Sequence, residues 1–122
     1  MLTSVPIEFD AAPQRQRGRQ RLQVMLATTP LARMRGLLAR PPLERGQALY
    51  ISPCNMVHTV GMGYPIDVVF LRRDGLVLKV AGGVQPRRLR GHWRAAAVLE
   101  LVAGEAARCA IVPGVRLPLE AP

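Results

Sequence analysis

The feature that most constrains the fold of this sequence is a carboxylate inside an apolar segment. Residues 66–73, IDVVFLRR, have the pattern of a strand in which Asp67 shares one face with Val69 and Leu71. Burying a carboxylate without a partner costs several kcal/mol, so Asp67 needs hydrogen bonds or a cation close by. The nearest candidate partners in the sequence lie in the preceding loop: Asn55, His58 and Thr59.

The rest of the chain predicts an α+β domain that is mostly β. Thr29 is a good N-cap and Pro30 suits the first helical position, so a helix should begin there and end near Arg40, before two prolines. Its apolar stripe is expected to comprise Leu31, Met34, Leu37 and Leu38. The segments with strand character are 22–27, 48–52, 66–73, 76–81, 96–103, and a last hairpin of 109–112 and 115–119.

Three of these segments carry finer expectations. Asp74-Gly75 is a strong hairpin signal between 66–73 and 76–81. Residues 66–73 are apolar on both faces, which is typical of a central strand. Residues 96–103 fit a helix or a strand by periodicity; the clustered Val and Leu residues favour a strand, in which Glu100 would alternate outward.

Length and charge set the domain organisation. A chain of 122 residues has room for one hydrophobic core. Residues 1–20 contain alternating arginines that continue to Arg21 and predict a flexible basic arm, leaving 21–120 as a single globular domain. The sequence has no apolar run long enough to span a membrane and begins unlike a secretory signal, so a soluble cytoplasmic protein is expected. Cys54 and Cys109 should then be reduced.

The formal net charge is +9, and every basic residue except Lys79 is arginine. Arginine binds phosphate well, which suits a nucleic-acid partner. A coding sequence biased towards Arg, Ala, Gly and Pro would give the same excess without any function. The charge alone predicts weak, salt-sensitive binding to polyanions.

Three ordered segments resemble one known family: MLATTPLARMRGLLAR, PCNMVHTVGMGYPIDVVFLRRDGLVLKV and AAAVLELVAG. Over residues 22–119 the chain is similar to the prokaryotic domain-of-unknown-function 192 family. The resemblance implies a compact, mixed, β-barrel-like sheet with one short helix after the first strand, and it implies no activity, substrate or catalytic residue. The chain departs from the family pattern at Gly114-Val115, where Gly-Asp is usual, and at Cys109, where a glycine or aliphatic residue is usual.

Four kinds of site follow from the residues around Asp67. A zinc site of Cys54, His58, His92 and Cys109 has the right ligands but the wrong spacing, so no metal or cofactor is expected. Cys54 and His58 could form a nucleophile pair or a thiol sensor, oriented by Asp67 or Asn55. His58 could instead bond Asp67 as a structural pair. The loop could also line a ligand pocket, with these residues: Cys54, Asn55, His58, Thr59, Met62 and Asp67.

A second surface could bind nucleic acid. Trp93 lies among arginines and could stack on a base, and the set comprises Arg87, Arg88, Arg90, Trp93 and Arg94 together with the arm at 15–21. The sequence favours a non-enzymatic domain that binds a small molecule or a protein through the loop before Asp67. A basic nucleic-acid-associated protein is the first alternative, and an enzyme or thiol sensor built on Cys54, His58 and Asp67 is the second.

Overall fold

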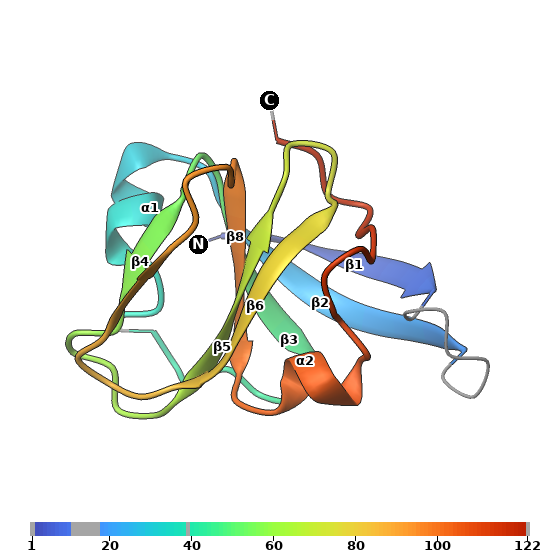
Figure 1. The fold of residues 1–122 in the computed structure, drawn as a ribbon. Helices are drawn as coiled ribbons and strands as arrows, with labels where there is room; N and C mark the ends of the chain where they lie inside the picture. The colour runs from blue at the N-terminus through green and yellow to red at the C-terminus, as the bar shows by residue number, and fades with distance from the viewer. Residues whose placement is uncertain (1, 11–17, 39, 122) are drawn as a thin grey trace.

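The chain folds around a six-stranded mixed sheet, shown in Figure 1. The computed structural model describes residues 2–10, 18–38 and 40–121. The strands, in their order across the sheet, are β1 (Thr3–Asp10), β2 (Arg19–Ala27), β3 (Gln47–Ile51), β8 (Ala97–Val102), β5 (Ile66–Leu71) and β6 (Val77–Val84). The β2–β3 pair is parallel and the other neighbours are antiparallel.

The sheet is open, so the barrel-like prediction is wrong. Closing a barrel requires the two edge strands to pair. Here residues near the C-terminus hydrogen-bond to the beginning of β6 instead: the Val77 N–H donates to the Val115 carbonyl, and the Gly114 N–H donates to the Val77 carbonyl. This segment takes part of the edge at which β6 would have to meet β1.

Each face of the sheet is covered by its own apolar layer. On one face, Val69 and Leu101 pack with the helix α2 (Glu105–Arg108) and the C-terminal segment. On the other face, Val68 and Phe70 pack beneath a second, two-stranded sheet of β4 (Met56–His58) and β7 (Leu89–Gly91) and the turn that follows the helix α1 (Pro30–Arg35).

The two central strands match their predictions. All six residues of β5 are buried, as expected of a strand that is apolar on both faces, and it lies between β8 and β6. The segment that fits both helix and strand forms strand β8. The hairpin at Asp74-Gly75 is present, with Gly75 at a φ of 87°.

Gly75 also marks a close approach of the C-terminal segment. A Cβ at this position would collide with the Leu117 carbonyl oxygen and lie 2.8 Å from that of Leu119. Only glycine therefore allows the C-terminal segment to cross this turn, and the same segment blocks closure of the sheet.

Several local predictions are wrong. Thr3–Asp10, expected within a flexible arm, is paired along its whole length with β2, and Arg15 and Arg17 lie outside the described residues. The helix ends at Arg35 rather than Arg40, and Gly36 follows at a φ of 53°. The expected hairpin strand at 109–112 is absent because Glu105–Arg108 forms α2 and Cys109 caps it. The strand predicted over 76–81 is longer than expected and ends at Val84, and residues 89–91 form a further strand, β7, that was not predicted.

Among the helices that the structure describes, none is both long and apolar enough to cross a membrane.

Candidate functional site

A small cavity of about 90 Å³ lies between the α1 turn, β4 and β8. Apolar side chains form most of its wall, and Met34 and Met56 stand at its rim with 79% and 56% of their surface exposed. Four polar or titratable side chains from different elements also line it: Arg33 and Arg35 of α1, His58 of β4, and Glu100 of β8. Cys54, between β3 and β4, completes this group.

Glu100 is the unusual member of this group. It is 5% exposed and pairs with Leu49 of β3 and Val68 of β5 in the middle of the sheet. Its carboxyl makes no hydrogen bond or ion pair with any residue that the structure describes. Burial raises the pKa of Glu100 to about 7, because the apolar surroundings penalise the ionised form. The carboxyl can therefore hold or release a proton near neutral pH.

The prediction that Glu100 points outward is wrong. Alternation places it on the same face of β8 as Val98, and that face is covered by β4, β7 and the α1 turn. The signal that could have found it is the one that singled out Asp67, a carboxylate flanked by apolar residues on both sides. A strand buried on both faces leaves no outward position for a charge.

Arg33 contributes a second buried polar atom without a partner. Its Nη1 donates to the Pro53 carbonyl at 3.2 Å, but its Nε is buried and has no hydrogen-bond partner in the described part of the chain. α1 presents it from a turn that Thr29 caps, with the Ala32 N–H donating to the Thr29 hydroxyl at 3.2 Å. Arg33, which lines the cavity, thus carries an unused N–H donor.

Cys54 and His58 both line the cavity, but the thiol does not bond the imidazole. The Cys54 Sγ donates to the Met56 carbonyl at 3.2 Å. Burial is the largest cause raising the pKa of Cys54, and the nearby Glu100 charge raises it further. A thiol held in its protonated form is a poor nucleophile.

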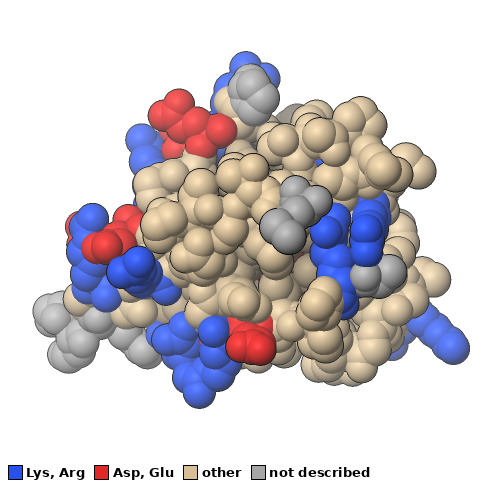
Figure 2. All heavy atoms as spheres, turned by 180° about the vertical axis from the view of Figure 1, so that it is seen from behind, with Lys and Arg blue, Asp and Glu red and all other residues tan. Residues whose placement is uncertain are grey.

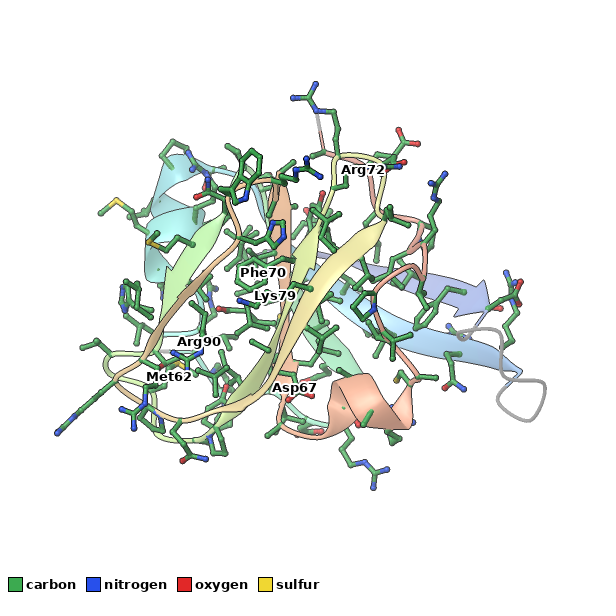
Figure 3. All side chains as sticks on the ribbon, viewed as in Figure 1. Met62, Asp67, Phe70, Arg72, Lys79 and Arg90 are labelled. Atoms are coloured by element: carbon green, nitrogen blue, oxygen red, sulfur yellow. The ribbon has the colours of Figure 1, made fainter. Side chains whose placement is uncertain are left out.

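Asp67 lies outside the cavity and is fully satisfied. Its Oδ1 accepts from the Gly83 N–H at 2.8 Å, and its Oδ2 accepts from the Gly104 and Ala106 N–H groups at 3.0 and 2.9 Å. Asp67 therefore ties β5 to β6 and caps α2, whose N-cap Gly104 has no side chain for the task. Figure 3 shows it beside α2, across the sheet from Met62 and Arg90. The predicted His58–Asp67 pair is wrong.

The remaining predicted loop residues separate into different environments. Met62 lines the cavity, whereas Asn55 lines a broader and more open hollow beside Arg73. Thr59 is 1% exposed, donates to the Gln85 carbonyl at 2.7 Å and accepts from the Arg88 N–H at 2.8 Å. Thr59 thus anchors the loop before β7, and its buried hydroxyl is used for that contact.

The four predicted zinc ligands do not meet. Cys109 is fully buried in the apolar layer beneath α2, whereas Cys54 packs against the layer on the opposite face of the sheet. Within the described residues, no three His, Cys, Asp or Glu side chains are grouped so that they could hold a metal.

The predicted nucleic-acid surface lies beside the cavity, on and around β7. Trp93 is 80% exposed, and the Arg94 guanidinium lies 4.9 Å from the centre of its ring. The Arg88 and Arg90 side chains donate to the neighbouring carbonyls of Arg87 and Leu89. This surface adjoins the rim of the cavity, because Gly91 of β7 lies next to the Met56 side chain. A Cβ added to Gly91 would be 3.4 Å from the Met56 Cε.

Comparisons with known proteins identify the family to which the chain belongs. The family model described as DUF192, Uncharacterized ACR, COG1430, matches residues 12–119. The chain belongs to DUF192. No curated protein matches it. The DUF192 membership confirms the resemblance found in the sequence and brings no assigned activity.

Two solved structures share the fold of this DUF192 chain. A "putative transcription regulator" of Sinorhizobium meliloti 1021 is 24% identical, with a TM-score of 0.83 over 95% of this chain and 93% of the other. A protein of unknown function from Novosphingobium aromaticivorans DSM 12444 is 25% identical, with a TM-score of 0.81 over 95% and 85% of the two chains. These likenesses support the fold and leave the function to the site.

Proposed function

We propose that this protein is a non-enzymatic binding domain that docks an acidic segment of a partner polypeptide. The surface concerned is the α1–β4–β7 face, defined as residues 33–35 of α1, β4, β7 and residues 92–96. The observation that carries the proposal is the cavity in this face, which is lined by the buried and unpartnered Glu100 and by the exposed side chains of Met34 and Met56. Three further properties support it.

The first property is the size of the cavity. Pockets for whole cofactors or metabolites usually measure about 300–1,000 Å³. The Glu100 cavity, at about 90 Å³, fits a single side chain or a terminal group. A ligand that extends beyond the cavity would have to rest on the surrounding surface, as a polypeptide does.

The second property is the composition of that surface. Interfaces between proteins are enriched in aromatic residues, methionine and arginine. The exposed large apolar side chains of the α1–β4–β7 face stand on the cavity rim or on β7 and the residues that follow it. Three of the four are of these types, namely Met34, Met56 and Trp93, and the fourth is Leu89.

The third property is charge. The segments that form the α1–β4–β7 face contain no acidic residue. They contain these arginines: Arg33, Arg35, Arg90 and Arg94. A partner that complements this face is therefore acidic.

The enzymatic alternative has less support. Burial raises the pKa of Cys54, the hydrogen-bond partner of its thiol is a carbonyl rather than His58, and Asp67 is committed to three backbone N–H groups. A nucleophile needs a lowered pKa or a neighbouring base. The three residues lack the mutual geometry of a catalytic site.

The proposal is tested by selecting random-sequence peptides, displayed on phage, against the full chain. We expect the selected peptides to be rich in Asp and Glu next to apolar residues. Met34→Gln should weaken their binding about fivefold or more, as the loss of an interface anchor does. Leu31→Gln is the matched control, because Leu31 is exposed to a similar extent on the same helix but lies outside the cavity. Equal binding by both variants, or no enrichment of acidic peptides, would contradict docking on this face.

A second candidate function is single-stranded nucleic-acid binding by β7 and its flanks. The exposed Trp93 with Arg94 over its ring, and the Arg88 and Arg90 side chains that bond only carbonyls in the described structure, support it. This candidate predicts binding of a fluorescent oligonucleotide with a steep salt dependence that Trp93→Ala weakens by loss of stacking. A steep salt dependence without any effect of Trp93→Ala would indicate non-specific attraction only.

A further inference from the structure

Two side chains that line the cavity carry polar groups without partners, and both groups can donate a hydrogen bond. Glu100 comes from β8 and has no hydrogen-bond or ion-pair partner in the described structure. Arg33 comes from α1, and its buried Nε is likewise without an acceptor among the described residues. Of the buried carboxylates, Asp67 accepts from three N–H groups and Glu105 accepts from the Gly46 N–H and Arg108. Glu100 alone among these three lacks such a network.

The charged groups that face Glu100 are mainly basic. Arg33 and Arg35 come from α1, and His58 comes from β4, together with the thiol of Cys54. The neighbouring strands β3 and β5 contribute the apolar Ile51 and Ile66. Farther along the same layer, Lys79 and His92 lie 5.8 and 6.3 Å from the Phe70 ring. A cationic group entering the cavity would be repelled by the positive charges of Arg33 and Arg35, whereas an anionic group would be attracted by them.

We propose that the cavity takes a carboxylate group of the docked segment, held by the Arg33 Nε–H and by the O–H of protonated Glu100. This inference rests on the proposed function and specifies the group that the partner inserts. An O–H···O⁻ bond between a carboxylic acid and a carboxylate is short and strong, as is a bond from guanidinium to carboxylate. Both unused donors would be satisfied by one planar acceptor, and the buried Glu100 would stay neutral.

The proposal gives a definite dependence on pH. Burial raises the pKa of Glu100 to about 7, so the carboxyl is mostly protonated at pH 6 and mostly ionised at pH 8. Only the protonated form can donate to the ligand, so carboxylate affinity should fall about tenfold between pH 6 and pH 8. Binding above pH 7 should take up one proton. A cationic ligand would show the opposite trend, because it needs the ionised form.

The test is a titration of the full chain with butyrate, butyramide and butylammonium at pH 6 and at pH 8. Binding is measured from the amide chemical shifts of the protein. Butyrate should shift the signals of cavity residues at pH 6 with about tenfold higher affinity than at pH 8. It should also raise the pKa of Glu100, measured from its side-chain carbon shift. Equal binding of butyramide, or butylammonium binding that strengthens with pH, would overturn the proposal.

Variants separate Glu100 from the other titratable groups. Glu100→Gln keeps a donor, so butyrate should still bind but with no change between pH 6 and pH 8. His58→Gln should retain the pH dependence. Arg33→Gln should weaken binding, and Arg73→Gln, which removes the same charge outside the cavity and the α1–β4–β7 face, should change it less than twofold. Should Glu100→Gln retain the pH dependence, or should Arg73→Gln weaken binding as much as Arg33→Gln, Glu100 and Arg33 would not be the groups that hold the carboxylate.

Selected peptides identify the source of the carboxylate and separate this inference from the proposed function. Amide capping of the C-terminus tests a terminal carboxylate, and single Asp→Asn or Glu→Gln changes in the peptide test a side chain. One of these should abolish the pH dependence of binding. Peptides that depend on Met34 but on no single carboxylate would overturn this inference and leave the docking proposal standing. Butyrate binding at the cavity without any peptide binding would support the carboxylate site and contradict the docking proposal.

Discussion

Asp67 and Glu100 are buried carboxylates on adjacent strands of the same sheet, and they have opposite surroundings. Asp67 of β5 pairs with Leu101, and Glu100 of β8 pairs with Val68, so the two acids are one position apart in register and point to opposite faces. Asp67 accepts three backbone N–H bonds. Glu100 has no such bond in the described structure and lines a cavity. The first acid completes the fold, whereas the second is a cost to the fold that a ligand could offset.

The surface shows the same division. Near β1, β2 and the C-terminal segment, arginines are paired with acids: Arg19 with Glu8 and Asp10, and Arg72 and Arg116 with Asp74. In Figure 2, acidic and basic groups lie together on the left side of the molecule, while the right side shows basic groups only. These ion pairs lie around β1, β2, the β5–β6 turn and the C-terminal segment, whereas the basic groups around α1 and β7 are the charges that the proposed partner would meet.

The largest expected effect comes from removing Asp67. Asp67→Ala would leave the N–H groups of Gly83, Gly104 and Ala106 without their acceptor, and each such loss costs about 1–3 kcal/mol. We expect the free energy of unfolding to fall by about 3 kcal/mol or more, measured by urea denaturation. Glu100→Ala is the matched control, because no N–H group in the described structure loses an acceptor there. Similar losses in the two variants would abolish the distinction between the two carboxylates.

A second prediction concerns the pH dependence of stability. Burial raises the pKa of Glu100 from the ordinary 4.5 to about 7. Between these pH values the unfolded chain releases a proton that the folded chain keeps, so stability falls as pH rises and levels off above pH 7. The shift corresponds to about 3 kcal/mol.

Urea denaturation between pH 4.5 and pH 8 measures this loss. Glu100→Gln cannot titrate, so its stability relative to the wild type should rise across this range by the same amount. Parallel stability curves for the two proteins would mean that the folded state ionises Glu100 without penalty. That result would remove the contrast with Asp67.

The sequence was sufficient to predict that Asp67 is buried and bonded, but not to name its partners. Its donors are backbone N–H groups of Gly83, Gly104 and Ala106, which any residue type could supply. The side chain of His58 makes it a candidate donor to Asp67 from the sequence alone. The backbone donors can be identified only once the positions of β6 and α2 are known. The central strands β5 and β8 were predicted correctly because runs of buried apolar residues give a strong local signal.

The site was predicted only in part, for two physical reasons. Cys54, His58 and Met62 do line a cavity, but its floor comes from Glu100, more than thirty residues later in the chain. Glu100 was predicted to face solvent. The alternation of residues along a strand shows on which face a side chain lies, but it does not show what covers that face. In β1, the alternation of Val5, Ile7 and Phe9 is a strand signal that the neighbouring arginine-rich segment obscured.

The smallest expected effect tests whether Glu100 acts on its neighbours in the cavity. Burial raises the pKa of Cys54, and the charge of Glu100 adds to the increase. Iodoacetamide should therefore alkylate Cys54 at pH 8.5 more slowly than it alkylates an ordinary accessible thiol. In the Glu100→Gln variant the rate should increase a few-fold, by less than about tenfold. At pH 6, where Glu100 already holds its proton, the same substitution should leave the rate unchanged.

Cys109, fully buried on the opposite face, serves as the internal control when the two cysteines are resolved by peptide mass spectrometry. Equal acceleration of both thiols would mean that Glu100→Gln loosens the whole fold, and an unchanged Cys54 rate would mean that the carboxylate and the thiol do not share one electrostatic environment.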